Sequence, residues 1–257
     1  LSNVVYTILA LEWFYTDQVR NRILAIVLAN TTTFLIVILF NQKSIQLSKT
    51  ISWLRLKQSS LYVFSFGIPL ILHQSSFFVK GQLDRIFIYK NFSISELGIY
   101  SAGVQIASAL PVIFMALNKA IVPYYYENLR IKKLTTDKIK KYVLYSIPIC
   151  IFPSILALIL PNTAYTWFLG NHFGQSHYYV IFYLLGFGLN LPYLLLVNYF
   201  FYHGKNTLIS KFTIFSSFIY LILLALLTQL SLKYVPSALI VSNIILIVLL
   251  WRNLKNV

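Results

Sequence analysis

Charged residues are scarce in this chain of 257 residues, and acidic residues are the scarcest of them. Only 11% of the residues are charged, whereas a typical soluble domain has about 25%. The single cysteine, Cys150, excludes an internal disulfide, and its position within a long apolar run predicts a small buried side chain. With 58% hydrophobic residues, these shortages exclude a water-soluble globule and indicate a polytopic membrane protein.

Motifs of metal and nucleotide chemistry are also missing from the sequence. It contains no HExxH pattern, no paired cysteines and no GxxxxGK[ST] phosphate loop. The histidines are scattered without metal-ligand spacing: His73, His172, His177 and His203. We therefore expect no metal, no other cofactor and no ATP hydrolysis by this chain. His172 and His177 lie in the segment WFLGNHFGQSH, which we interpret as a surface turn.

Long apolar runs dominate what is present. A bilayer core needs about 20 apolar residues per helix, and eight runs reach or approach this length: 1–14, 23–42, 61–88, 98–118, 141–163, 177–201, 207–229 and 235–251. Their continuous hydrophobicity predicts an all-α membrane helix bundle. Because the chain begins with Leu1 and no signal segment opens it, we interpret it as a piece of a longer protein.

Basic residues flank these runs and account for the net charge of +15. This placement points to lipid headgroups and not to nucleic acid as the anionic partner. By the positive-inside rule, the basic connectors 43–60 and 119–141 are predicted to be cytoplasmic. Residues 51–58, ISWLRLKQ, resemble an amphipathic helix lying on the inner leaflet. We expect residues 1–42 to end one bundle, 43–60 to connect, and 61–257 to form a six-helix bundle.

One predicted span, 61–88, carries ionisable residues within its apolar sequence. On a helix, His73, Lys80 and Asp84 lie within about 40° of one another, and Arg85 lies beside them. A charge at mid-membrane costs about 2.5–3.5 kcal/mol on insertion scales, so these groups should avoid lipid. They either form a structural ion pair, Lys80 with Asp84, or face a polar cavity.

Polar residues in other predicted spans favour the cavity, since they would share its lining. The candidates from these spans are Gln105, Asn118, Lys119, Asn190 and Tyr193. Asn and Gln also join membrane helices by hydrogen bonds, which is the structural alternative.

Several segments resemble the polysaccharide flippase family, the Wzx-type lipid-linked oligosaccharide translocases of the MATE-like exporter superfamily. The resemblance covers about residues 61–220 and is most specific in LDRIFI, ELGIYSAG and NKAIVPYYYENL, with YLLLVNYFFYHGKNTLIS as a further segment. It implies at least twelve helices in two bundles around a central cavity, with alternating access, in the bacterial inner membrane. TQLSLKYVPSALIVSNI departs from the pattern, because Pro236 and Ser237 stand where a Gly-Ala-rich turn is expected.

The resemblance implies a transporter that moves undecaprenyl-pyrophosphate-linked O-antigen or capsule units to the outer leaflet. Lys80, Arg85 and Lys119 would supply a cationic lumen, and Asp84 would restrain one cation or exchange protons. Coupling to a proton or sodium gradient and contact with other polysaccharide assembly proteins fit this family. Two alternatives remain: a polymerase of the same pathway, disfavoured by the short outer loops, and a drug or cation exporter, which would need an acidic cavity.

Overall fold

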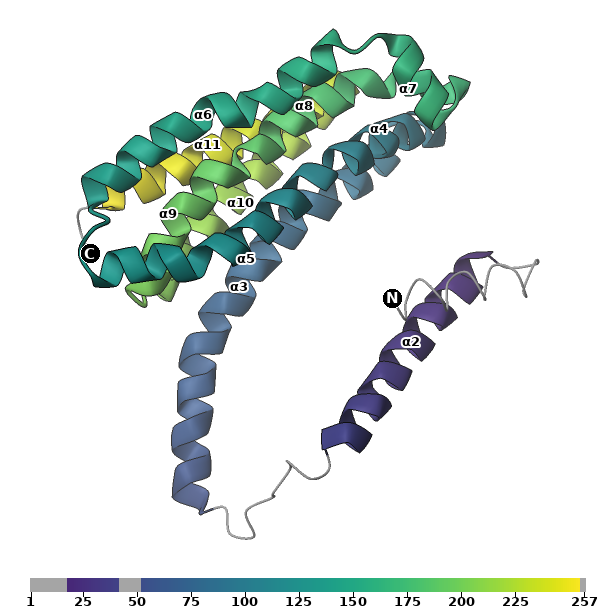
Figure 1. The fold of residues 1–257 in the computed structure, drawn as a ribbon. Helices are drawn as coiled ribbons and strands as arrows, with labels where there is room; N and C mark the ends of the chain where they lie inside the picture. Colours follow the sequence, from purple (N-terminus) through teal and green to yellow (C-terminus); the bar gives the residue numbers. More distant parts are fainter. Residues whose placement is uncertain (1–17, 42–51, 255–257) are drawn as a thin grey trace. The chain divides into compact units, whose positions relative to one another are not determined.

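The computed structural model describes residues 18–41 and 52–254. Within them the chain forms helices and no strand, and Figure 1 shows their arrangement. The helices are α2 (Gln18–Asn41), α3 (Trp53–Asn91), α4 (Ile94–Ala107), α5 (Ala109–Arg130), α6 (Thr136–Ile159), α7 (Asn162–Leu169), η1 (Asn171–Phe173), α8 (Ser176–Gly188), α9 (Asn190–Tyr202), α10 (Asn206–Leu230), η2 (Leu232–Tyr234) and α11 (Val235–Asn253).

Seven stretches among the described residues are long and apolar enough to cross a membrane. They are Ile23–Phe40, Trp53–Asn91, Ile94–Arg130, Thr136–Ile159, Ser176–Tyr202, Asn206–Leu230 and Leu232–Asn253. Each of them overlaps one of the predicted runs from 23–42 onward, whereas the predicted run 1–14 lies outside the described residues. The prediction of an all-α polytopic membrane bundle is confirmed.

The chain divides into two units, Leu1–Ser60 and Leu61–Val257. The division falls at the end of the predicted connector 43–60, of which residues 43–51 lie outside the described part. In the first unit, α2 carries one candidate span. In the second, α6 packs along α8 and α9, α10 packs along α11, and α4 packs along α8.

Two predicted spans are each built from two consecutive helices, with the break three residues before a proline. Ser108 separates α4 from α5, and Leu189 separates α8 from α9. Pro111 and Pro192 then occupy the first turn of the following helix. Proline has no N–H to donate and is tolerated at this position, because the first-turn amides have no partner within the helix.

Two expectations about the connectors are wrong. Residues 53–58 do not form a separate surface helix, because α3 runs without a break from Trp53 to Asn91 and no Gly or Pro precedes Gly67. Residues 119–130 belong to α5 and not to a connector, which shortens the predicted loop 119–141 to the five residues before α6. At 1.5 Å per residue, α3 is about 58 Å long, roughly twice the thickness of a bilayer core.

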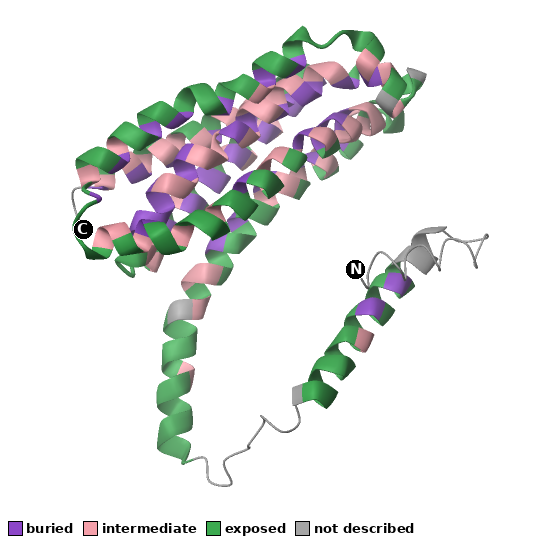
Figure 2. Cartoon of the chain, in the orientation of Figure 1, coloured by how far each residue is buried: buried purple, intermediate pink, exposed green. Residues whose placement is uncertain are grey.

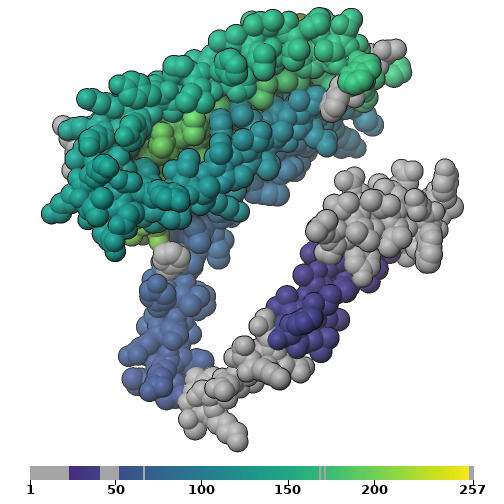
Figure 3. Space-filling view, viewed as in Figure 1, coloured from purple at the N-terminus to yellow at the C-terminus, as the bar shows by residue number. Residues whose placement is uncertain are grey.

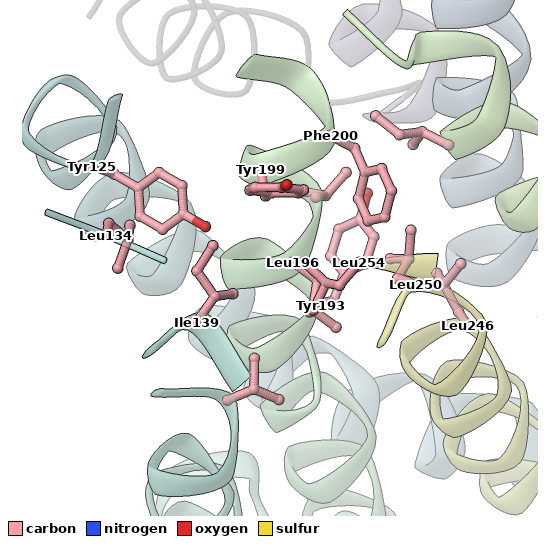
Figure 4. Packing of buried hydrophobic residues seen from close by; sticks show 13 residues of the cluster. Tyr125, Leu134, Ile139, Tyr193, Leu196, Tyr199, Phe200, Leu246, Leu250 and Leu254 are labelled. Carbon is pink, nitrogen blue, oxygen red and sulfur yellow. The ribbon is translucent and has the colours of Figure 1, made fainter. Parts of the chain in front are cut away.

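Buried residues in the second unit form two large clusters and one small one. Figure 2 shows that buried positions gather on α8 to α11, while much of the outer surface of α6 is exposed. Those exposed positions include large apolar side chains such as Phe152, which is 63% exposed, as expected for lipid contact. In the first cluster, Tyr125 of α5 points its ring toward α9 (Figure 4) and donates a hydrogen bond to the Leu195 carbonyl at 2.8 Å.

Hydroxyl groups and glycines bring the helices of the second unit together. Ser154 donates to the Ile181 carbonyl at 2.9 Å, and Ser217 donates to the Ser76 carbonyl at 3.1 Å. These bonds join α6 to α8 and α10 to α3. Small residues allow such close approach, which is typical of helix packing in membranes.

Gly103 allows α4 to approach α8, and we expect Gly103→Ala to destabilise the bundle. A Cβ at this position would lie 2.7 Å from the Tyr179 Cβ and 2.9 Å from the Ser176 carbonyl oxygen. Overpacking of this kind costs about 1–3 kcal/mol, so the purified protein should unfold several degrees earlier in a thermal melt. Gly67→Ala is the matched control, since a Cβ at Gly67 meets nothing within 4 Å. An equal loss of stability in both variants would contradict this account.

Candidate functional site

The polar face predicted on residues 61–88 lies on the buried side of α3. His73, Lys80 and Asp84 are 4%, 6% and 1% exposed. The side chain of Arg85 is 31% exposed. From His73 to Asp84 the axial rise is about 16 Å, so these ionisable groups extend over about half of a bilayer core.

Asp84 accepts hydrogen bonds from two buried tyrosines that sequence reasoning did not select. The hydroxyl groups of Tyr100 in α4 and Tyr183 in α8 reach the same carboxylate oxygen, Oδ2, at 2.5 Å and 3.1 Å. The two hydroxyls also contact each other, and since each has one proton, a hydroxyl that donates to the other no longer donates to Asp84; the two rings meet edge to face. The Arg85 guanidinium lies 3.3 Å from Oδ1, and the Arg85 backbone N–H donates to Oδ1 at 2.9 Å. The carboxylate is therefore held by three helices.

A third tyrosine, Tyr220 of α10, belongs to the same region. It is fully buried, and its hydroxyl has no hydrogen-bond partner in the described part of the chain. Asp84 and Arg85 are both close enough to act on it electrostatically. No spacing rule identifies these tyrosines from the sequence, which contains 19 of them. The available signal is that Tyr183 and Tyr220 lie inside apolar runs and away from the run ends, where membrane tyrosines concentrate; Tyr100, near the start of its run, gives no such signal.

Lys80 does not pair with Asp84, so the structural ion pair considered from the sequence is not formed. Its ammonium group donates to Ser216 Oγ of α10 at 2.7 Å and to Asn243 Oδ1 of α11 at 2.9 Å. Ser216 donates in turn to the Ser242 carbonyl, and Asn243 donates to the Gly186 carbonyl. Neutral oxygens therefore hold a buried cation here, and within the described residues no acid is paired with it.

His73 lies seven residues, about two helical turns, before Lys80 on α3, and it contacts Tyr193 of α9. The Tyr193 hydroxyl lies 3.2 Å from His73 Nε2, and Thr213 Oγ1 lies 3.3 Å from His73 Nδ1. The Phe77 ring meets the imidazole edge to face. Because the Thr213 hydroxyl donates to backbone carbonyls of α10, His73 donates from Nδ1 to Thr213, and Nε2 of the neutral ring accepts from Tyr193.

The remaining predicted residues lie elsewhere on the bundle. Asn118 accepts a hydrogen bond of 2.7 Å from Asn198, which joins α5 to α9. Gln105 and Lys119 are exposed, and Asn190 is half-buried at the start of α9. That all nine predicted side chains face one aqueous passage stays a prediction.

A separate cavity of about 540 Å³ lies where α7, η1, α8 and η2 meet α4. His172 and His177, predicted to form only a surface turn, both line it, together with Gln175 and Lys233. His177 Nε2 lies 3.3 Å from the Ala157 carbonyl oxygen, and its ring contacts Tyr165. Among residues 18–41 and 52–254, no three His, Cys, Asp or Glu side chains are grouped so that they could hold a metal ion.

Comparisons with known proteins give two relatives from Haemophilus influenzae. One, described as "Lsg locus putative protein 1", is 41% identical over 251 residues, which are 98% of this chain and 62% of the relative. The other, described as "Uncharacterized membrane protein", is 40% identical over 257 residues, which are 100% of this chain and 63% of the relative. No protein-family model and no solved structure matches. The chain is a polytopic helical membrane protein similar to these two relatives, and it spans about three fifths of their length.

Proposed function

We propose that the chain forms part of a transporter that moves lipid-linked oligosaccharides from the inner to the outer leaflet of a bacterial inner membrane. The observation that carries the proposal is the row of ionisable groups on one span, in which His73, Lys80 and Asp84 are held by polar groups of neighbouring helices and Arg85 contacts Asp84. Ionisable residues inside a membrane are costly and commonly mark a substrate or ion pathway. The resemblance of the 83–129 segment to polysaccharide flippases supports the choice of substrate.

The proposed substrate has a hydrophilic sugar pyrophosphate head that cannot cross hydrocarbon unaided. Cations at Lys80, Arg85 and Lys119 would attract the pyrophosphate, and tyrosine and asparagine side chains would bind sugar hydroxyls. On this proposal, Asp84 restrains the neighbouring cation of Arg85, whose guanidinium lies 3.3 Å from Oδ1. On this proposal the basic segment 43–52 and the basic loop 131–135 face the cytoplasm.

The leaflet in which lipid-linked units accumulate separates this proposal from its alternatives. In cells that lack the protein, we expect single lipid-linked units to collect on the inner leaflet. The measurement treats right-side-out vesicles from these cells with a sugar oxidant that cannot cross the membrane. Units on the inner leaflet should then escape oxidation. The same treatment of vesicles opened with detergent measures the total amount of oxidisable lipid-linked sugar and serves as the control. Accumulation on the outer leaflet would favour a polymerase, and unchanged lipid-linked pools would favour an exporter of drugs or cations. Either outcome would overturn the flippase proposal.

A further inference from the structure

A groove lies where α5 ends and α6 begins, away from the ionisable row on α3. Its volume is about 410 Å³, within the range of about 300–1,000 Å³ found for small-molecule sites. Leu195 of α9 forms its inner wall and is fixed there by the hydrogen bond from Tyr125. In the space-filling view the green surface of α9 is visible between the teal surfaces of α5 and α6 (Figure 3).

The loop end of the groove is cationic. Lys133 and Lys138 line it together with Asn128, and no acidic residue does. Lys138 Nζ donates to the Lys133 carbonyl at 2.8 Å, so the loop is tied to the first turn of α6. The turn is closed by Lys132 in the left-handed conformation, with φ of 54°. Two lysines thereby line one opening.

The other end of the groove is apolar and aromatic. Ile121, Tyr124 and Tyr142 line it and are 51%, 73% and 48% exposed. Ile121 lies two helical turns before Asn128, about 10 Å along the axis of α5. The groove thus changes from cationic at the loop to apolar toward the middle of the span, which is the polarity profile of a lipid beside a membrane protein.

We propose that this groove binds an anionic membrane phospholipid. Its phosphate lies between Lys133 and Lys138, and the first part of an acyl chain lies along Ile121 and Tyr142. Basic pockets between membrane helices bind anionic headgroups in this way, and a phosphate oxygen accepts strong hydrogen bonds from ammonium groups. The apolar half of the groove favours a lipid over free phosphate. The site is independent of the proposed transport function.

The test measures the affinity of the purified full chain in neutral detergent for phosphatidylglycerol, by titration followed with native mass spectrometry. We expect Lys133→Gln/Lys138→Gln to weaken binding about 16- to 36-fold, since each lysine near a membrane surface contributes about a four- to sixfold gain in affinity. Lys140→Gln/Lys141→Gln is the matched control, because it removes two charges from α6, close to Lys138 in the sequence, without touching the groove lining. It should change affinity by no more than about twofold, if charge beyond the groove is largely screened.

Three results would overturn the proposal. Equal weakening in both double variants would mean diffuse attraction by the basic segment and no defined site. If Lys133→Gln/Lys138→Gln binds phosphatidylglycerol as tightly as the wild type does, these two lysines do not bind the headgroup. Binding of inorganic phosphate as tight as that of phosphatidylglycerol would make free phosphate the ligand. If the double variant does not fold, Lys133→Gln alone replaces it, with an expected loss of about fivefold.

Discussion

Asp84→Asn is expected to reduce transport of the lipid-linked glycan at least about 100-fold while the protein still inserts and folds. The substitution keeps the shape of the side chain and removes the charge that Tyr100 and Tyr183 contact. Breaking a buried charged network costs about 3–5 kcal/mol. The loss in free energy of unfolding should be smaller than this here, because the Arg85 side chain that loses its partner is 31% exposed and its guanidinium can be hydrated.

The measurement compares glycan at the cell surface with the amount and thermal stability of the membrane-inserted protein. Asp137→Asn is the matched control, because Asp137 is an exposed acid in the first turn of α6 and should leave transport unchanged. Tyr100→Phe and Tyr183→Phe each remove one donor and should give intermediate losses. Wild-type glycan output from Asp84→Asn would show that the carboxylate only braces the helices.

Lys80→Met is expected to leave the protein as stable as the wild type, or more stable, and to abolish transport. Methionine is unbranched and of similar length, so it fills the space without a charge. Replacing buried ionic groups by apolar ones of similar volume is often neutral or stabilising. The former partners remain bonded, since Ser216 still donates to Ser242 and Asn243 still donates to Gly186.

Lys80→Ala provides the comparison, since it leaves a cavity and should lower stability. Large-to-small substitutions in a packed core cost about 2–5 kcal/mol. Thermal melts of both variants, followed by tryptophan fluorescence, give the stabilities, and surface glycan gives the activity. If Lys80→Met transports normally, the ammonium has no role in translocation. If Lys80→Met unfolds, Lys80 is needed as an interhelical brace.

The spans could be predicted from the sequence because bilayer thickness fixes the length of an apolar run. The predicted run 207–229 became α10, Asn206–Leu230, and the run 235–251 became α11, Val235–Asn253. Helix junctions were harder to predict. Residues 119–130 carry polar groups and suggested a connector, but nothing in them stops a helix, and α5 continues through Pro123 to Arg130.

The candidate site was predictable along one helix and not across helices. Helical spacing places His73, Lys80 and Asp84 on one face, and the structure has all three buried. Their partners depend on how α4, α8, α10 and α11 pack against α3, which no local pattern encodes. Spacing suggested an ion pair between Lys80 and Asp84. In the packed bundle, Lys80 instead bonds to Ser216 and Asn243, and Asp84 accepts from two tyrosines.

Continuity of α3 has a mechanical consequence for the ionisable groups. His73, Lys80 and Asp84 all follow Pro69, whose carbonyl accepts a hydrogen bond from Ser210 of α10. Proline weakens a helix locally, so bending concentrates there while the segment beyond it stays stiff. Bending at Pro69 would therefore move the three groups together relative to their partners on the neighbouring helices.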